Sequence, residues 1–428
     1  MKKCLATIVF AVIVLTSCSS VRMISSQQKW HYSQQPKNII FMIVDGMGFE
    51  YVKAARIYNG QQNLAYEKFP CSSQVTTCAV DGADIDGVCV KDSPHITDSA
   101  AGATAMATGV KVKNGVVSKN SAYQHTDIES ILEIAKRQGK STGIIATKLF
   151  TDATPAAFVA HTEHRTMTEE ILRDIFQGSL PNLILGADTP DHRQAARNSL
   201  AKYSMVHTAD TLKSLADTIE QGNNCTNKDC PYVYGGFGQY EMIPGKFSLK
   251  TGLPLEITPA ETFAEYKIPH LSQMTDAALK ILKKNDNGFF LMVESSLTDM
   301  IGHNNKFIDA SKESPSAIVA LIQEMREMER TAKVLENFVQ DNPDTLVVLT
   351  ADHETGGLVI EEDKTQCLGS QGCIPSVRWT SANYDDNPKS VAQHTGVNVP
   401  LYAIGRGAEK FCRDMINNSD LKAMALGR

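Results

Sequence analysis

Residues 38–48 read NIIFMIVDGMG, a nearly continuous apolar run that stops at an aspartate and two glycines. An apolar run without polar alternation is typical of a strand that is buried on both faces, as in a parallel sheet. Five further stretches have this character: TGIIAT (142–147), NLILG (182–186), GFFLMVE (288–294), TLVVLTA (345–351) and PLYAIG (400–405). Together they predict the strands of one central sheet.

Helical patterns lie between these strands. Apolar residues recur every three or four positions in 127–139, 166–178, 270–285 and 314–339, as in amphipathic helices. The alternation predicts an α/β fold with a doubly wound, largely parallel central sheet flanked by helices. Two stretches interrupt the alternation, at about 223–262 and 355–394, and the second contains a possible hairpin. We expect both to be surface insertions on a single domain of residues 37–428.

The N-terminus has the pattern of an export signal. Lys2 and Lys3 precede an apolar stretch over 5–15, and LTSCSS (15–20) resembles the end of a bacterial lipoprotein signal. We therefore expect a signal peptide over 1–17 and a polar tether over 18–36. A lipidated Cys18 would hold the protein in the periplasm on a bacterial membrane, with the outer membrane as the expected one. The alternative is an ordinary secretory signal in which the cysteine is incidental.

Charge and cysteine content narrow the possible partners and compartments. The formal net charge of −6 gives no reason to expect nucleic acid as a partner. Export makes the cysteines disulfide candidates, and the close pairs in CTNKDC (225–230) and CLGSQGC (367–373) predict local bridges. A bridge between Cys71 and Cys78 is possible, which leaves Cys89 and Cys412 unassigned.

Carboxylates and histidines recur where the predicted strands end. In open α/β sheets ligands bind outside the carboxyl ends of the strands. A single aspartate after a strand is most often a turn former, and a single histidine is most often structural. Recurrence at one edge of the sheet favours a functional site. The carboxylates and histidines concerned are Asp45, Asp152, Glu294, Asp299, His303, Asp352, His353 and His394, and the hydroxyl of Thr154 lies two residues after Asp152 in the sequence.

Spacing indicates how some of these side chains could share a metal ion. Asp299 and His303 are four residues apart, so on a helix they point from one face. Asp352 and His353 are adjacent and can serve one ion only if the chain turns there, which the following Glu-Thr-Gly-Gly permits. Glu294 ends an apolar run, and a buried carboxylate is costly unless it is paired or binds a cation.

Ser99 is the candidate nucleophile, in HITDSAAGATAMATG (95–109) at the start of a small-residue helix. No lysine or histidine lies one turn away to take its proton. The surrounding motif TDSAAGATA, together with VDGMG, DATPAAFVAHTEHR, VESSLTDMIGH, TADHETGG and QHTG, resembles the alkaline phosphatase family. The motifs occur in family order, and the resemblance extends from about residue 37 to 406.

The resemblance implies two zinc ions and one magnesium ion. One zinc would bind Asp299, His303 and His394, and the other Asp352, His353 and Asp45, with Ser99 joining it. Magnesium would bind Asp45, Thr154 and Glu294, with Asp152 nearby; histidines suit zinc, whereas oxygen donors suit magnesium. Zinc favours the deprotonated form of a bound oxygen, so Ser99 would attack phosphorus without a histidine base.

The family pattern also places Arg165 as a phosphate clamp, and Asp98 could orient its guanidinium. His161 and His164 are expected to be structural. A formal count of ions and side chains leaves an excess of roughly one positive charge, which suits a small phosphomonoester substrate. Family members are often homodimers, and a homodimer is possible here.

One residue departs from the best-known family pattern. Met300 follows Asp299 at a position where the enteric bacterial form has a lysine. Methionine carries no charge toward phosphate, so we expect weaker binding of inorganic phosphate than in the lysine-bearing forms.

Two other functions remain open from the sequence. One is a phosphodiesterase or phosphotransferase of the same superfamily, although Glu294, Thr154 and Arg165 favour the monoesterase. The other is a lipid-anchored protein that binds zinc or phosphate without turnover, although the intact set of ligands and the nucleophile favour an enzyme.

Overall fold

The computed structural model describes residues 35–428 except 61, 83–88, 90–95, 121–125, 227–228, 239, 244–245, 250–267, 306–315, 368–371 and 382–392. The predicted signal peptide, Cys18 and nearly all of the predicted tether lie outside the described residues. Among the residues that are described, no helix combines the length and the hydropathy needed to cross a bilayer.

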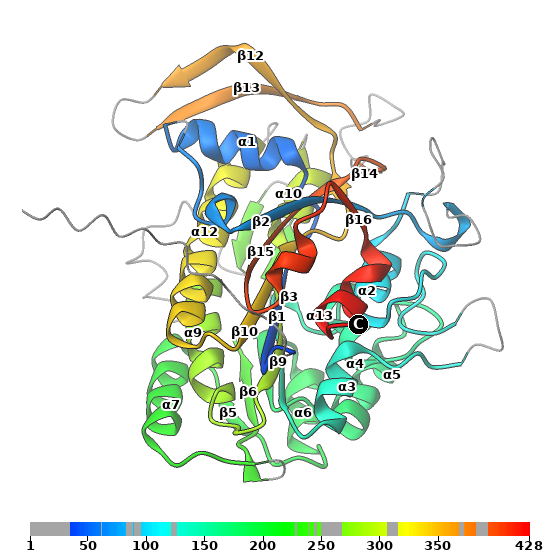
Figure 1. Cartoon of the computed structure of the whole chain (residues 1–428), viewed down its shortest axis with the longest axis vertical. Helices are drawn as coiled ribbons and strands as arrows, with labels where there is room; N and C mark the ends of the chain where they lie inside the picture. Colours follow the sequence, from blue (N-terminus) through cyan, green and yellow to red (C-terminus); the bar gives the residue numbers. More distant parts are fainter. Residues whose placement is uncertain are drawn as a thin grey trace, which may run out of the picture. The chain divides into compact units, whose positions relative to one another are not determined.

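A ten-stranded sheet forms the centre of the fold, in the order β16-β2-β15-β10-β1-β9-β3-β4-β6-β5 (Figure 1). Six of its strands are those that the sequence predicts: β1 (Asn38–Val44), β3 (Ser141–Leu149), β4 (Leu183–Ala187), β9 (Phe289–Ser295), β10 (Thr345–Thr350) and β15 (Val399–Gly405). The others are β2 (Cys71–Thr76), β5 (Ser204–Val206), β6 (Val233–Gly236) and β16 (Met415–Asn417). Only β15 runs antiparallel to its neighbours in this described sheet, so the prediction of a largely parallel sheet is confirmed.

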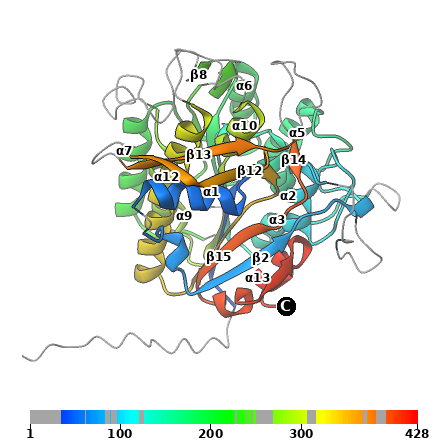
Figure 2. The same ribbon diagram turned by 90° about the horizontal axis from the view of Figure 1, so that it is seen from above.

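Helices cover both faces of the sheet. The α-helices of the described residues are α1 (Phe49–Tyr58), α2 (Ser99–Thr108), α3 (Ile131–Arg137), α4 (Ala153–Val159), α5 (Thr168–Arg173), α6 (Pro190–Arg197), α7 (Ala209–Gln221), α9 (Leu271–Leu282), α10 (Leu297–His303), α12 (Ala317–Asp341) and α13 (Leu421–Ala425). Short 3-10 helices are η1 (Tyr66–Lys68), η2 (Val80–Gly82), η6 (Ala408–Phe411) and η7 (Asn418–Asp420). Helices α7, α9 and α12 gather on one side of the sheet and α2, α3 and α4 on the other (Figures 1 and 2).

Local sequence sets where these helices begin and end. The helix expected over 127–139 starts only at Ile131, because Ser130 and Glu133 form a capping box that satisfies the free N–H groups of its first turn. The helix expected over 166–178 is α5 followed by a π-helical segment, η3 (Asp174–Ser179). The long α12 buries its Met-rich stripe in the core, as predicted for a core-facing helix.

Antiparallel pairs of strands lie outside the ten-stranded sheet. Strands β12 (Leu358–Cys367) and β13 (Cys373–Trp379) pair antiparallel, as predicted for the 355–394 stretch, and lie against α1 (Figure 1). The other small pairs are β7 (Tyr240–Ile243) with β8 (Lys246–Leu249), and β11 (Glu354–Thr355) with β14 (His394–Thr395). Strand β6 falls inside the stretch expected to be an insertion at 223–262 but belongs to the central sheet, so an insertion there can begin only after Gly236.

Four disulfides connect the eight cysteines of the described residues. The local bridges Cys225–Cys230 and Cys367–Cys373 are as predicted. The possible Cys71–Cys78 bridge is wrong, because Cys71 pairs with Cys412, 341 residues away, and Cys78 pairs with Cys89. The Cys71–Cys412 bridge connects strand β2 to the segment that follows η6, near the edge of the sheet.

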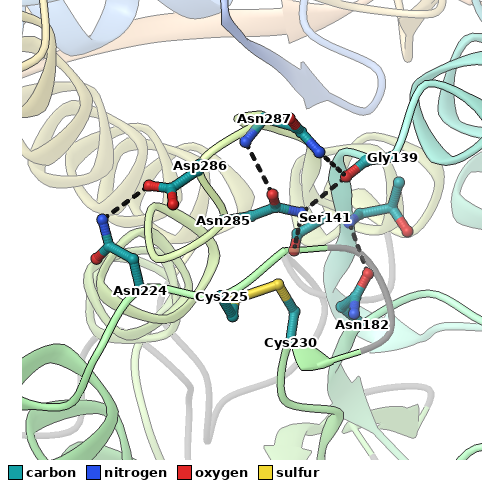
Figure 3. Close-up of a disulfide and its surroundings, with 10 residues drawn as sticks. Gly139, Ser141, Asn182, Asn224, Cys225, Cys230, Asn285, Asp286 and Asn287 are labelled. Atoms are coloured by element: carbon teal, nitrogen blue, oxygen red, sulfur yellow. Dashed lines mark hydrogen bonds between the residues drawn. A yellow bond between two sulfur atoms is a disulfide. The ribbon is translucent and has the colours of Figure 1, made fainter.

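A network of amides fastens the amino-terminal ends of two central strands (Figure 3). The Asn285 side chain donates to the Gly139 carbonyl at 2.9 Å and to Ser141 Oγ at 3.1 Å. The Cys225 N–H donates to the Lys284 carbonyl at 2.8 Å, which places the Cys225–Cys230 loop beside Asn285. Strands β3 and β9 are thereby fixed at this end, and their opposite ends carry the site described next.

Candidate active site

Four neighbouring strands place the predicted site residues at one edge of the sheet. Asp45 follows β1, Glu294 lies near the end of β9, and Asp352 follows β10. Asp152 follows β3 and precedes α4. Since β10, β1, β9 and β3 are consecutive in the sheet and mutually parallel, their carboxyl ends meet at one place.

A glycine turn lets helix α10 approach this edge. Gly46 has φ +76°, and a Cβ there would lie 2.8 Å from the Asp299 Cα atom. Only glycine accepts both this backbone conformation and this close approach. The Thr298 hydroxyl donates to the Asp45 carbonyl at 2.6 Å and fastens the first turn of α10 to the end of β1.

The first cluster consists of Asp299, His303 and His394. Asp299 Oδ1 lies 3.3 Å from His303 Nε2 and 3.6 Å from His394 Nε2, and the two ring nitrogens are 3.0 Å apart. Helix α10 supplies the first two residues from one face, as their spacing predicts, and β14 supplies the third. The three ligand atoms lie close enough together to bind one metal ion.

The second cluster surrounds His353. Its Nε2 lies 3.2 Å from Ser99 Oγ, 3.3 Å from Asp352 Oδ2 and 3.6 Å from Asp45 Oδ1. The chain leaves β10 after Thr350, so the adjacent Asp352 and His353 turn toward the same point. Asp352 Oδ1 accepts from the backbone N–H groups of Gly46 and His353, which leaves Oδ2 directed to the cluster.

Two supporting groups orient these rings, and sequence reasoning did not single them out. The Thr355 hydroxyl donates to Asp299 Oδ1 at 2.5 Å and lies 3.2 Å from His353 Nδ1, so it touches both clusters. The Thr97 carbonyl lies 3.0 Å from His394 Nδ1. Such partners fix the ring orientation of metal-binding histidines. Thr355 belongs to the motif TADHETGG, which was the available signal.

Buried carboxylate oxygens at this edge have no hydrogen-bond partner among the residues that the structure describes: Asp45 Oδ1, Asp352 Oδ2 and both Oε atoms of Glu294. Burial and the Asp152 charge raise the pKa of Glu294 to about 8, and burial and the Asp299 charge raise that of Asp352 to about 7. Burial and the Asp352 charge likewise raise the pKa of Asp45. Buried carboxyl groups this close together either take up protons or bind a cation that offsets their charge.

His353 and His394 are held in the neutral form that binds metals. Burial and the His394 ring lower the pKa of His353 well below its usual value, and burial lowers that of His394. Neutral imidazole beside carboxylate is a donor set that suits zinc, whereas the all-oxygen environment of Glu294 suits magnesium. The residues present therefore fit divalent cations. Thr154 is buried in the first turn of α4, two residues after Asp152.

Ser99 begins α2, and Asp98 caps that helix. The Asp98 carboxylate accepts from the N–H groups of Ala101 at 2.9 Å and Gly115 at 3.0 Å. The Asn114 side chain accepts from the Asp98 N–H at 2.9 Å and so holds the cap in place. Ser99 is almost fully buried, with its hydroxyl directed to His353.

Arg165 lies between two carboxylates. Its Nη1 is 3.4 Å from Asp98 Oδ2 and its Nη2 is 3.1 Å from Asp152 Oδ1. Although burial lowers the pKa of Arg165, these carboxylates outweigh burial and raise it. A guanidinium has five N–H donors, so the two contacts leave donors for a phosphate group.

An open pocket of about 760 Å³ lies over Ser99, and Arg165, Met300 and His303 are in its lining. Lys148 also lines this pocket, although sequence reasoning did not select it. It forms an ion pair with Asp152, and this carboxylate raises the pKa of Lys148 despite the opposing effect of burial. The available signal was the position of Lys148 directly after the predicted strand TGIIAT (142–147).

The two histidines of the motif DATPAAFVAHTEHR make contacts with protein groups. His161 Nε2 lies 2.8 Å from Glu133 Oε1, and its Nδ1 lies 2.9 Å from the Ser118 carbonyl. His164 Nδ1 lies 2.9 Å from the Thr166 hydroxyl. The contacts of His161 are with Glu133 and Ser118 in other segments of the chain, whereas that of His164 is with a neighbouring residue.

Comparison with known proteins gives one consistent result. The family model described as alkaline phosphatase matches residues 36–181 and 247–399. Alkaline phosphatase 3 of Bacillus subtilis is 31% identical over 378 residues, which cover 85% of this chain and 71% of that protein. The alkaline phosphatase of Escherichia coli is 27% identical over 413 residues, which cover 86% of this chain and 81% of that protein.

Solved structures show the same fold. The alkaline phosphatase of the Antarctic bacterium TAB5 superposes with a TM-score of 0.66 at 23% identity, covering 92% of this chain and 98% of that one. A variant of that enzyme, solved with Mg bound, gives a TM-score of 0.67 at 24% identity and the same coverage.

Proposed function

Since this chain belongs to the alkaline phosphatase family and is a phosphomonoesterase, we propose that it hydrolyses phosphate monoesters through a phosphoserine formed on Ser99. The products are an alcohol and inorganic phosphate. The observation that carries this proposal is the position of the Ser99 hydroxyl, 3.2 Å from His353 Nε2 and within the pocket that Arg165 lines.

The chain's own residues would hold three divalent cations. We assign one zinc to Asp299, His303 and His394, and a second to Asp352, His353 and Asp45, beside Ser99. A magnesium ion would be held by Asp45, Glu294 and Thr154, with Asp152 nearby. When bound, such ions stabilise negative charge on the serine oxygen, on the phosphoryl group and on the leaving oxygen.

Ser99 is held ready for attack by the start of α2. The Asp98 cap occupies the N–H of Ala101, and the positive end of the helix stabilises an ionised Ser99 by roughly 0.3–1 kcal/mol. The serine oxygen attacks phosphorus, and the alcohol leaves on the opposite side of the phosphoryl group. A water molecule then cleaves the phosphoserine, which releases phosphate and restores the Ser99 hydroxyl.

Arg165 binds and orients the phosphoryl group during both displacements. Asp98 and Asp152 hold the guanidinium from two sides, so its fork has one orientation in the pocket. Fixing the phosphoryl oxygens aligns phosphorus with Ser99, and the planar guanidinium suits two of these oxygens at once.

We propose that the protein is exported and anchored to a bacterial membrane through a lipidated Cys18. The lipoprotein-like pattern of residues 15–20 supports this, and the four disulfides suit an oxidising compartment such as the periplasm. Mass spectrometry of the mature N-terminus tests the anchor. An N-terminal residue other than an acylated Cys18 contradicts it.

The enzymatic proposal is tested by metal analysis together with hydrolysis of an aryl phosphomonoester and an aryl phosphodiester, before and after chelation. We expect zinc and magnesium in the purified protein, preference for the monoester, and loss of activity on chelation. Ser99→Ala should abolish turnover while the metal content is retained. A protein that prefers the diester, or that binds zinc and never releases phosphate, contradicts the proposal.

A further inference from the structure

Lys148 enters the active-site pocket from an irregular point of strand β3. The pairing of β3 with β4 shifts register between Ile145 and Leu149, where the strand no longer follows a regular pleat. Lys148 lies in this irregular segment, and its side chain is about one-quarter exposed and lines the pocket that contains Ser99. Its ammonium group is therefore available to a molecule bound in the pocket.

One carboxylate anchors both cationic side chains of the pocket. Asp152 Oδ2 pairs with Lys148 Nζ, and Asp152 Oδ1 pairs with Arg165 Nη2 at 3.1 Å. These two charges hold the pKa of Asp152 at about 2, although burial alone would raise it. An ammonium group has three N–H donors, so a contact with Asp152 leaves two for another anion.

Among the described residues that line the pocket, Lys148 is the one lysine and Arg165 the one arginine, and Met300 is uncharged. The expectation that phosphate binds more weakly than in the lysine-bearing forms was drawn from Met300 alone and did not include this second cation. A phosphate dianion over Ser99 would lie in the pocket that both side chains line.

We propose that Lys148 is a phosphate-binding residue of this enzyme, positioned by Asp152, that acts together with Arg165 on the substrate and on the product phosphate. This inference rests on the proposed function, the hydrolysis of phosphate monoesters at Ser99. A lysine contact strengthens the binding of a phosphoryl group in every complex that contains it, so both the substrate and inorganic phosphate should bind less tightly without it.

The test compares Lys148→Gln and Lys148→Arg with Lys213→Gln in the metal-loaded enzyme. Lys213 and Asp217 form the matched control, because they are also an i,i+4 lysine–aspartate pair but lie on the exposed face of α7. The measurements are calorimetric binding of inorganic phosphate, kcat and KM for an aryl phosphomonoester, and metal content by mass spectrometry.

We expect Lys148→Gln to weaken phosphate binding about tenfold, as for the loss of one charge-assisted hydrogen bond, with KM rising more than kcat falls. Lys148→Arg should stay within about threefold of the wild type, and Lys213→Gln should be unchanged. Metal content should be equal in all four proteins.

Two results overturn the inference. In the first, Lys148→Gln binds phosphate and substrate as the wild type does, which leaves only a structural ion pair. In the second, the variant loses metal, which places the effect of Lys148 on the cations instead of on phosphate. A wild-type protein that loads metal but releases no phosphate from the monoester refutes the proposed function itself. The two results above concern only Lys148 and leave the proposed function standing.

Discussion

In the metal-free protein, the free energy of unfolding should decrease as the pH rises from 6.5 to 8. Burial raises the pKa of Glu294 from an ordinary value near 4.5 to about 8, and that of Asp352 to about 7, in the metal-free fold. In this pH range the folded protein holds protons that the unfolded chain has released. The free energy of unfolding therefore decreases as the pH rises toward the folded-state pKa values.

The size of the effect follows from these two groups. Each extra proton bound by the folded state contributes about 1.4 kcal/mol per pH unit. Between pH 6.5 and 8, Glu294 contributes about 2 kcal/mol, and Asp352 adds somewhat less than about 1 kcal/mol over the same range. Asp45, whose pKa is also raised, acts in the same direction. For a chain of this size the sum corresponds to a fall of a few degrees in Tm.

The assay is thermal unfolding of the chelated and the metal-saturated protein at several pH values between 6.5 and 8. Bound cations keep the carboxylates ionised in the folded state, so the metal-saturated protein should lack this decrease. His161, with its pKa raised to about 9, also loses stabilising effect over this range, but equally in both forms. The difference between the two Tm values should therefore widen as the pH rises.

Glu294→Gln is the matched control, because it removes one titrating group while keeping the size of the side chain. The chelated variant should have a shallower slope, by up to about 1.4 kcal/mol per pH unit near pH 6.5 and by about half of that at pH 8. Parallel pH profiles for the chelated and metal-saturated wild type, or a chelated protein that gains stability toward pH 8, would refute the reasoning that these buried carboxyls are protonated without metal.

Three further outcomes test separate parts of the structure. Met300→Lys should tighten inhibition by inorganic phosphate roughly three- to tenfold, and unchanged or weaker inhibition contradicts the role given to this position. Thr355→Val removes the hydroxyl that donates to Asp299, so the variant should bind metal roughly 10- to 100-fold less tightly, measured by competition with a chelator. A variant that retains metal as the wild type does contradicts this role of Thr355. Breaking the Cys71–Cys412 bridge with Cys412→Ser should cost about 2–5 kcal/mol of stability, measured by unfolding without reductant, whereas an unchanged Tm shows the bridge to be dispensable.

The central strands and the site edge could be predicted because their signals are local and repeated. Asp45, Glu294 and Asp352 each follow or end an apolar run, and in a parallel sheet such runs all end at the same edge. That these ends also lie side by side depends on the strand order β10-β1-β9, which the sequence alone does not show. The sequence did not reveal that β15 is antiparallel, since a strand buried on both faces reads as the same apolar run in either direction.

Other features could not be predicted from the sequence because the contacts that determine them are long-range or because their local sequence is atypical. Strand β6 reads VYGG, which is typical of a loop, yet a Cβ on Gly236 would overlap the Asp188 carboxylate, so the packing requires glycine there. The Cys71–Cys412 bridge joins segments 341 residues apart, and loop spacing favours only local pairs. Lys148 escaped because its direction depends on the irregular pairing of β3, which no periodic pattern encodes.

The places where local rules are broken coincide with the site. Buried, unpartnered oxygens of Asp45, Glu294 and Asp352 destabilise the metal-free fold, and a sequence selected for stability alone would replace them. They persist because the surrounding contacts hold the ligands in position before any ion binds. Thr298 fixes the end of β1, and Thr355 fixes both clusters. A site organised in this way need not rearrange to bind its ions, so the cost in stability is repaid as metal affinity.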